Sequence, residues 1–418
     1  MKRSSVIIIG AGASGLMAAS ELAADTEVTV LEAQSITGGR IGSYEMQGCL
    51  IETGAEFVHG NPGITLGLLK KAGLDYTSTE GKMYRKKDNG FEEPDEIAAG
   101  MDKLLKKMKA LKEDMPMQSL LEKYFDGEEN ASLRKQIKSY VEGFDLGDVN
   151  KVSVKALCRE WEGEKEGNHR IKGGYTALLQ YLQGQAVALG CKFHLQTVIK
   201  KVKWKKGNVT VYTAIGKEFS AEKLLVTIPV SMLSNGYIQY DPPNDFIETM
   251  AKDIGFGAVI KVVVQFKNVF WQKDAGFVLS DELFPTWWTQ LPDTIPVLTG
   301  WLGGPKAVPV SQHTEEEITE MALSSLAALF NMNLPQIKEQ VVRSKVFNWQ
   351  KNEFIMGGYS YDTIHSAAAR KKLLAPIQDT IFFAGEGLYS GPHPGTVEAA
   401  FVSGLDAARD IKSRLLLF

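Results

Sequence analysis

A glycine-rich turn near the N-terminus has the residue types and spacing that bind a dinucleotide. Gly10-Ala11-Gly12-Ala13-Ser14-Gly15 follows an apolar run, and Glu32 closes the next apolar run. In such a motif the first glycine permits a tight turn, the second lets a pyrophosphate approach the backbone, and the third allows close packing of helix on strand. The helix N-terminus stabilises the anion, and Glu32 can accept hydrogen bonds from ribose hydroxyls. A glycine turn without a ligand is the alternative, which the surrounding pattern disfavours. The predicted contacts here are Gly10, Gly12, Ala13, Ser14, Gly15, Glu32 and Ala33.

A second loop, Gly38-Gly39-Arg40, distinguishes between the common dinucleotides. A domain that binds only NAD has no use for this loop. Two glycines before an arginine place a rigid planar cation where the chain passes close to a phosphate. Together the two motifs resemble the flavin amine oxidase superfamily. The resemblance implies that the dinucleotide is FAD.

Several further segments match this family in order, and together they cover nearly the whole chain. The resemblance implies that segment 52–60 runs beside the isoalloxazine ring and that the strand containing Val198 holds the adenine. Gly173-Gly174-Tyr175 resembles the point where the chain returns to the FAD domain. A C-terminal motif around Glu386 is implied to contact the ribityl and diphosphate groups. The residues so assigned to FAD are Gly39, Arg40, Gly54, Ala55, Glu56, Phe57, Val198, Gly385, Glu386, Gly395, Thr396 and Val397.

Lys261 lies in a predicted strand, Ala258 to Phe266. By alternation alone, the face that carries Lys261, Val263 and Gln265 would be the solvent side. In amine oxidases of the family, however, a lysine in the matching strand holds a water against flavin N5. The flanking segments 255–257 and 270–271 frame this lysine as the family does. The resemblance therefore implies a catalytic Lys261, whose ammonium would stabilise the reduced, anionic flavin.

Tyr359 matches one wall of the aromatic cage that faces the flavin. An aromatic wall fixes an amine by stacking and cation–π attraction and excludes water from the reacting carbon. The second wall is usually aromatic in monoamine oxidases, but Thr396 stands there in this chain, as in animal-type polyamine oxidases and related histone demethylases. Gly358 stands where covalently flavinylated monoamine oxidases have a cysteine, which implies non-covalent, dissociable FAD.

His59 lies in a segment that resembles spermine and acetylpolyamine oxidases, in which this histidine lines the substrate tunnel. A purely structural histidine is the alternative. We expect Lys261, Tyr359, His59 and Thr396 at the reacting centre. Other roles stay open: Glu56 as a carboxylate for a cationic substrate or as a hydrogen-bond acceptor, His393 in a gate or a rigid turn, and Trp287 and Trp288 in a cavity or in the core.

The elements that must position these residues predict an α/β fold. The resemblance implies that it combines a Rossmann-type FAD-binding domain with a mixed-sheet plus helical substrate domain, interleaved as in amine oxidases. We expect the FAD-binding domain at 1–80, 171–257 and 369–418, and the substrate domain at 81–170 and 258–368, with 81–170 mainly helical.

Local patterns predict the individual elements. Apolar runs predict strands at Val6–Gly10, Glu27–Glu32 and Thr380–Gly385, with short strands between 191 and 229. Helices are expected at Ser14–Ala24 and Val397–Leu415, and the charged stretch 91–161 is expected to be helical. Within it, one apolar face consists of Met101, Leu104, Leu105, Met108 and Leu111.

Composition excludes several classes of protein. The 418 residues carry a net charge of −3, without the basic surface that nucleic acid or an anionic membrane requires. Cys49, Cys158 and Cys191 lie far apart, which disfavours a disulfide framework or a metal site and fits a reducing compartment. The apolar run after Lys2 and Arg3 is too short for a secretory signal, and no stretch, the C-terminal Leu415–Phe418 included, is long enough to span a bilayer. We expect a cytoplasmic protein.

The resemblance implies oxidation of an amine C–N bond to an imine with O2 as acceptor, giving H2O2 and aldehyde and amine products. Phe57 stands where amino-acid oxidases have an arginine that clamps a carboxylate, so a polyamine or alkyl amine is favoured. A monoamine or amino-acid oxidase is the alternative within the family. An FAD-dependent desaturase or porphyrinogen-type oxidase is an alternative from another class, which the strand of Lys261 disfavours. A non-catalytic flavin-binding protein is a further alternative, which the presence of both Lys261 and Tyr359 disfavours. The identity of the amine, the final electron acceptor and the oligomeric state are left open.

Overall fold

The computed structural model describes residues 4–46, 48–79, 81–88, 90–94, 99–163 and 167–415. The chain divides into two compact units, each assembled from separate stretches. The first unit comprises Met1–Tyr76, Ile171–Phe256 and Glu353–Phe418, and the second comprises Thr77–Arg170 and Gly257–Asn352. Two of the sequence expectations involve residues outside the described ranges. The expectation about a secretory signal involves Lys2 and Arg3, and the expectation about a C-terminal membrane segment involves residues 416–418.

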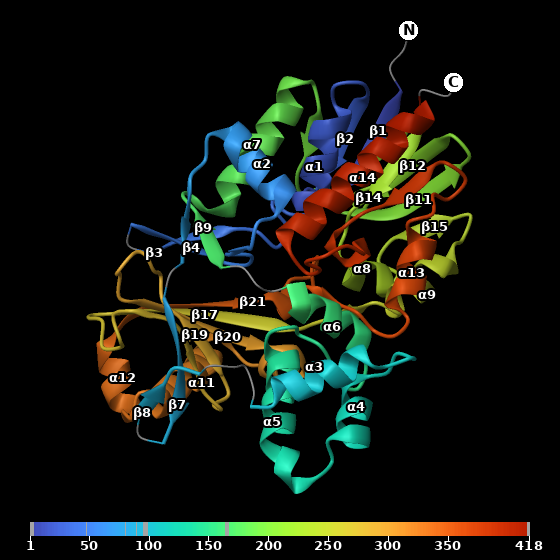
Figure 1. Cartoon of the computed structure of the whole chain (residues 1–418). Helices are drawn as coiled ribbons and strands as arrows, with labels where there is room; N and C mark the ends of the chain where they lie inside the picture. Colours follow the sequence, from blue (N-terminus) through green and yellow to red (C-terminus); the bar gives the residue numbers. More distant parts are fainter. Residues whose placement is uncertain are drawn as a thin grey trace. The chain divides into compact units, whose positions relative to one another are not determined.

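A five-stranded parallel sheet forms the centre of the described part of the first unit (Figure 1). Its order is β10-β2-β1-β14-β23, and each neighbouring pair is parallel. A parallel sheet of this kind is buried on both faces, which explains the continuous apolar runs in its sequence. The strands are β1 (Ser5–Ile9), β2 (Glu27–Leu31), β10 (Lys192–His194), β14 (Lys223–Val226) and β23 (Ile381–Phe383).

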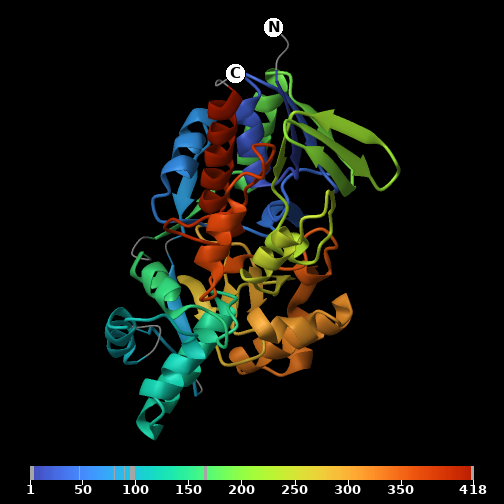
Figure 2. The same cartoon turned by 90° about the vertical axis from the view of Figure 1, so that its right-hand side faces the viewer.

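Different layers cover the two faces of this parallel sheet. Val6 and Ile8 of β1 pack with helices α1, α7 and α14, whereas Ile7 and Ile9 pack with a second, four-stranded sheet. In Figures 1 and 2, α14 (red) runs along α1 (dark blue). The helices of this unit are α1 (Ala13–Leu22), α2 (Gly63–Ala72), α7 (Gly174–Ala188), α8 (Val230–Ser234), α9 (Asp245–Lys252), α13 (Ser366–Leu373) and α14 (Val397–Leu415), with the 3-10 turn η4 (Glu386–Leu388). The four-stranded sheet consists of β11 (Ile199–Lys205), β12 (Asn208–Thr213), β13 (Glu218–Ala221) and β15 (Gln239–Asp241).

A seven-stranded mixed sheet dominates the described part of the second unit. Ile260, Val262, Val264 and Phe266 point to one face, where they pack with Ile318 and other residues of α11. The order of the sheet is β21 (Val341–Asn348), β17 (Val259–Phe266), β20 (Val297–Gly303), β19 (Thr286–Trp288), β18 (Ala275–Leu279), β7 (Lys82–Lys87) and β8 (Gly90–Glu92). The helices of this unit are α3 (Met101–Lys109), α4 (Met117–Tyr124), α5 (Ala131–Gly143), α6 (Val154–Gly163), α10 (Ala307–Val310), α11 (Glu315–Leu329) and α12 (Leu334–Gln340), with the 3-10 turns η1 (Glu128–Asn130), η2 (Gly304–Lys306) and η3 (Trp349–Lys351).

Short strands complete the two units. Ser43–Met46 and Cys49–Glu52 form the antiparallel pair β3–β4, and Gly255–Phe256 pairs with Ser360–Tyr361 as β16–β22. The remaining strands are β5 (Val58–His59), β6 (Tyr76–Ser78) and β9 (Asn168–Ile171). No helix in the described ranges is both long enough and apolar enough to cross a membrane.

The N-terminal strand, helix and strand and the C-terminal helix are confirmed within a few residues. Three details differ. Phe91 and Glu92 belong to strand β8 rather than to the expected helical stretch, in which residues 95–98 lie outside the described ranges. Leu111 lies beyond α3, because that helix ends at Lys109 and the Leu111 N–H turns back to the Met108 carbonyl. Val198 precedes β11 instead of lying in it.

Residues 353–368 group with the first unit, whereas the sequence-based division placed them in the substrate domain. The β16–β22 pairing gives the reason, since it joins Ser360–Tyr361 to Gly255–Phe256. The assignment of the two units as FAD-binding and substrate domains stays a prediction.

Candidate active site

Several of the residues expected to bind FAD follow strands of the parallel sheet. The loop 10–15 follows β1, Glu32 follows β2, and Gly385–Glu386 follows β23. Because all of these strands run parallel, their carboxyl ends share one edge of the sheet. Ligands of open α/β sheets bind at this edge.

The two glycine loops lie against each other with little space for side chains. A Cβ on Gly15 would lie 2.0 Å from the Gly10 carbonyl oxygen, so only glycine allows the helix to start this close to β1. Gly12 forms a parallel bridge with Gly38, and a Cβ on Gly39 would lie 3.4 Å from the Gly12 Cα. The two loops therefore approach each other through their backbone, which suits a site where a diphosphate must come close to the chain.

The N-terminus of α1 contains an unusual buried hydroxyl. The Ser14 Oγ is buried and has no hydrogen-bond partner among the described residues. The N-cap residue, Gly12, provides no side-chain cap. Since buried polar atoms are nearly always hydrogen-bonded, a phosphate oxygen at this helix end would satisfy both the hydroxyl and the backbone N–H groups. The residues present thus fit the dinucleotide that the sequence predicts.

Glu32 is fixed between the first glycine loop and the end of β2. One carboxylate oxygen accepts the Ala11 N–H at 2.7 Å and the other accepts the Gln34 N–H at 2.9 Å. Burial raises the pKa of Glu32, and these backbone hydrogen bonds offset part of that effect. Each oxygen keeps acceptor capacity for a ribose hydroxyl.

Val198 directly follows Thr197, whose backbone is hydrogen-bonded to that of Glu32. The Thr197 N–H donates to the Glu32 carbonyl at 2.7 Å, and the Val198 carbonyl accepts the Ala214 N–H at 2.8 Å. Ala33 is half-buried next to Glu32. The contact of Val198 with adenine stays a prediction.

Arg40 and Glu386, from two different sequence motifs, form an ion pair at 2.5 Å. The Arg40 guanidinium also donates to the Gly358 carbonyl at 2.7 Å and lies 5.6 Å from the centre of the Phe256 ring. Glu386 accepts the Ser360 hydroxyl at 2.7 Å. The predicted cofactor residues and the predicted aromatic wall, Tyr359, are therefore connected.

Tyr359 is half-buried, and its ring lies against Gly395, where a Cβ would come within 3.1 Å of the ring. The next residue, Thr396, caps α14: its hydroxyl donates to the His393 carbonyl at 2.7 Å and accepts the Ala399 N–H at 3.2 Å. His393 has a left-handed backbone, with φ of 62°. This conformation is uncommon for a residue other than glycine, and the role of His393 stays a prediction.

The segment expected to run beside the flavin ring is tied at both sides. The Ala55 N–H donates to the Arg40 carbonyl at 3.2 Å, and the buried Tyr175 hydroxyl donates to the Phe57 carbonyl at 3.3 Å. Burial raises the pKa of Tyr175, so this hydroxyl stays protonated and can donate. Glu56 is 6% exposed, and His59 is half-buried with its ring 6.2 Å from that of Phe57. The catalytic or substrate-facing roles of Glu56 and His59 stay predictions.

Lys261 belongs to the second unit and is completely buried, with an exposed fraction of 0%. The solvent-facing alternative suggested by strand alternation is therefore wrong. The reason is the position of β17 inside the mixed sheet, between β20 and β21, with both of its faces covered. Trp301 and Phe347 stand opposite Lys261 on these strands, and the Lys261 Nζ lies 5.3 Å from the centre of the Trp288 ring. The ammonium thus sits among aromatic side chains.

The adjacent tryptophans, Trp287 and Trp288, separate to opposite faces of the mixed sheet. Trp287 lies in the hydrophobic cluster with α11, and its indole donates to the Phe284 carbonyl at 3.0 Å. Trp288 lies on the face of Lys261, and its ring centre is 6.0 Å from that of Trp301. Core packing therefore explains Trp287, and Trp288 remains a candidate for the substrate site.

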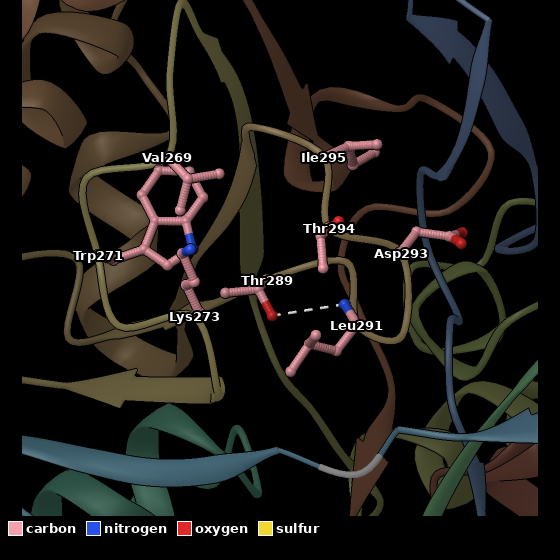
Figure 3. Close-up of a pocket in the computed structure, with 8 residues that line it drawn as sticks. All are labelled: Val269, Trp271, Lys273, Thr289, Leu291, Asp293, Thr294 and Ile295. Carbon is pink, nitrogen blue, oxygen red and sulfur yellow. Dashed lines mark hydrogen bonds between the residues drawn. The ribbon is translucent and has the colours of Figure 1, made fainter.

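Loops at one end of the mixed sheet enclose a separate pocket of about 330 Å³ (Figure 3). In Figure 3, the Trp271 indole faces Leu291 and Thr294, while Asp293 points away from them. Its lining is Val269, Trp271, Lys273, Thr289, Leu291, Asp293, Thr294 and Ile295. This set includes none of the residues predicted to act in catalysis or cofactor binding.

Sequence reasoning missed several residues that support the site. Ser360 contacts Glu386 directly, and the Thr227 hydroxyl donates to the Ile9 and Gly10 carbonyls at 2.9 and 3.0 Å. Glu398 accepts the Ile64 and Thr65 N–H groups and caps α2. A Cβ on Gly404 would lie 2.2 Å from the Ser14 carbonyl oxygen, so this glycine lets α14 cross α1 closely. A glycine inside a helical pattern was the available signal for Gly404.

The three cysteines are free, and burial raises the pKa of Cys191 to about 12. The described ranges contain no group of three or more His, Cys, Asp or Glu side chains arranged to hold a metal ion.

Comparisons with known proteins agree on one family. The sequence profile described as "Flavin containing amine oxidoreductase" matches residues 13–412. "Polyamine oxidase 4" of Oryza sativa subsp. japonica is 27% identical, over 99% of this chain and 89% of that protein. A putrescine oxidase solved with putrescine bound is 22% identical, with a TM-score of 0.82 over 99% of this chain and 100% of that chain. Cyclohexylamine oxidase from Brevibacterium oxydans IH-35A is 20% identical, with a TM-score of 0.81 over 99% of this chain and 100% of that chain.

At these identities the solved structures show the fold, and they confirm the predicted α/β, two-domain amine oxidase architecture. The family match spans residues 13–412, which include the Gly38–Gly39 loop, β17 and the C-terminal motif. It excludes a plain NAD-binding protein and confirms the resemblance seen in the residues. The chain belongs to the family of flavin-containing amine oxidoreductases.

Proposed function

We propose that this protein is an amine oxidase with non-covalently bound FAD that oxidises a polyamine or alkyl amine to an imine, with O2 as the final acceptor and H2O2 as a product. The observation that carries the proposal is the complete burial of Lys261 beside Trp288, Trp301 and Phe347. Burying an ammonium costs free energy. A role in the chemistry would account for a lysine at this buried position.

FAD, when bound, supplies the two-electron acceptor for the C–N bond. The residues of the chain bind and orient. The cradle of glycine loops, Ser14 and Glu32 would hold the dinucleotide, and the Lys261 ammonium would hold a water at Nζ. Tyr359 would present an aromatic face to the amine and exclude water from the reacting carbon. The substrate must enter as the neutral amine, because its nitrogen needs a free electron pair.

Three observations support a polyamine or alkyl amine over an amino acid. Phe57 offers no cation for a substrate carboxylate. Thr396 is engaged as a helix cap and would supply no second aromatic wall opposite Tyr359, which suits a long chain better than a planar aromatic amine. The similar proteins named above act on polyamines, putrescine and cyclohexylamine according to their names. Gly358 supports dissociable FAD, since it provides no thiol for a covalent link.

The test begins with the absorbance spectrum of the purified protein, followed by anaerobic addition of putrescine, spermidine, spermine, cyclohexylamine, benzylamine and an amino acid. We expect a flavin spectrum that a polyamine or alkyl amine bleaches, and H2O2 on admission of air. Acid precipitation should release the flavin into the supernatant.

Bleaching by the amino acid alone would contradict the proposed substrate class. A flavin that no amine reduces would contradict the catalytic proposal, and flavin retained in the acid precipitate would contradict non-covalent binding. Reduction without H2O2 in air would contradict the role of oxygen.

A further inference from the structure

A pair of opposite charges holds the backbone on both sides of Tyr359. Arg40 donates to the carbonyl of Gly358, which belongs to the peptide unit before Tyr359. Glu386 accepts the N–H of Ser360, at 3.3 and 3.4 Å to its two oxygens, and this group belongs to the peptide unit after Tyr359. Arg40 and Glu386 are themselves paired at 2.5 Å.

These contacts restrict the geometry of Tyr359 strongly. Peptide units are planar, so the two units joined at the Tyr359 Cα determine its φ and ψ angles and the direction of its side chain. The ring then lies against Gly395, where no Cβ fits without a contact of 3.1 Å. The backbone clamp therefore fixes where the side chain leaves the chain, and the lack of a side chain at Gly395 lets the ring lie there.

The Ser360 side chain completes the clamp. Its hydroxyl donates to Glu386 Oε2 at 2.7 Å, shorter than either contact from the Ser360 N–H. Ser360 is 4% exposed and Glu386 5% exposed, so this charge-assisted hydrogen bond is screened little by water. Two further contacts hold the same segment. Ser360 pairs with Phe256 in β16–β22, and Arg370 forms an ion pair with Asp362.

We propose that Ser360 is a positioning residue: through Glu386 and Arg40 it sets the direction of the Tyr359 ring. Arg40 and Glu386 come from the two motifs expected to hold FAD, so the residues that bind the cofactor also orient the wall that faces the amine. This inference rests on the proposed function, because it takes Tyr359 as that wall. It assigns a role to Ser360, which the sequence motifs did not single out.

The test compares Ser360→Ala with Ser366→Ala. Both changes remove a buried serine hydroxyl in the first unit, but Ser366 donates to the Asp253 carbonyl at 3.0 Å and does not contact the clamp. We expect Ser360→Ala alone to raise hydrogen–deuterium exchange over residues 357–361, measured on peptides with and without added FAD. We also expect unchanged FAD stoichiometry and flavin reduction by amine that is about tenfold slower, the usual effect of losing one hydrogen bond to a charged group.

A double-mutant cycle with Tyr359→Ala distinguishes positioning from general loosening. If Ser360 acts through the tyrosine, Ser360→Ala should add no further slowing of reduction when Tyr359 is already alanine. Equal slowing in both backgrounds, or equal exchange in Ser360→Ala and the unchanged protein, would overturn the inference. If no amine reduces the unchanged protein, the proposed function fails, and the exchange comparison by itself then decides whether the clamp orders the segment.

Discussion

The two sheets of this protein present their functional groups in different ways. The parallel sheet of the first unit presents backbone: glycine loops and helix ends follow its strands, and Glu32 is itself held by two backbone N–H groups. The mixed sheet of the second unit presents side chains from one face, where Lys261, Trp288 and Trp301 gather. The arrangement in the parallel sheet depends on local backbone conformation. The arrangement in the mixed sheet depends on which parts of the fold cover each face of the sheet.

This difference determines which substitutions matter in each unit. In the parallel sheet an added methyl group is harmful wherever the backbone must approach closely, as at Gly15. In the mixed sheet the effect of a substitution depends on the face on which the side chain lies. Residues that are adjacent in sequence therefore have unrelated roles. Trp287 and Trp288 show this dependence on the face most clearly, and their substitution gives the largest effect that we expect.

We predict that Trp287→Ala lowers the free energy of unfolding by about 3–5 kcal/mol, because it empties a fully buried site in the α11 cluster. Chemical denaturation of the flavin-loaded protein measures this change. Trp288→Ala should instead act mainly on kcat/KM for amines, since Trp288 lies beside Lys261. Equal loss of stability with unchanged kinetics in both variants would remove the distinction between the two faces.

Lys261→Met should slow reduction or reoxidation of the flavin by about 100-fold or more, the usual scale for removing a group that acts on the reacting atoms. FAD stoichiometry should stay unchanged. Stopped-flow measurement of each half-reaction identifies the step. Lys267→Met is the matched control, because Lys267 directly follows the same strand and is exposed. Near-normal turnover of Lys261→Met would leave the buried ammonium without a catalytic role.

Sequence alone supported the first unit better than the second for a physical reason. The conformations around Gly10–Gly15 and Gly38–Gly39 are local, so the residue types that permit them can be recognised directly. The burial of Lys261 is not local, since a charged residue at an alternating position looks the same whether its face meets water or other side chains. Only the resemblance to the amine oxidase family favoured a buried, catalytic Lys261. The clamp at Ser360 was invisible for a similar reason: it joins segments around 40, 360 and 386 that only the fold brings together.

Gly15→Ala tests the backbone side of the comparison. The new methyl group would lie 2.0 Å from the Gly10 carbonyl oxygen, so α1 must move away from the loop. We expect a loss of about 1–3 kcal/mol, the usual effect of overpacking, shared between the unfolding free energy and FAD affinity. Thermal unfolding and fluorescence titration with FAD measure the two parts. In Gly184→Ala, a control in α7 where nothing lies within 4 Å, stability should rise slightly and FAD affinity should not change. Matching behaviour of the two variants would mean that close approach at Gly15 is unimportant.

Glu32 gives the smallest expected effect, a pH dependence of less than tenfold per pH unit. Burial raises its pKa above the ordinary value of 4.5, so in FAD-free protein its contribution to stability is full below that value and is lost as the pH rises through the raised folded pKa. Ribose hydroxyls donate to the charged carboxylate, so FAD affinity should change in the opposite sense and fall as the pH is lowered through the same range.

Thermal unfolding of the FAD-free protein and FAD titration, both measured from pH 4.5 upward, should show these opposite slopes. Glu32→Gln removes the titrating group and should flatten both. Glu27→Gln, at the exposed start of the same strand, should change neither. If FAD affinity kept its slope in Glu32→Gln, the ribose contact would belong to another group. If only the slope of stability against pH vanished in Glu32→Gln, Glu32 would support the glycine loop and not the cofactor. FAD binding would then depend on backbone contacts even more than the comparison of the two sheets suggests.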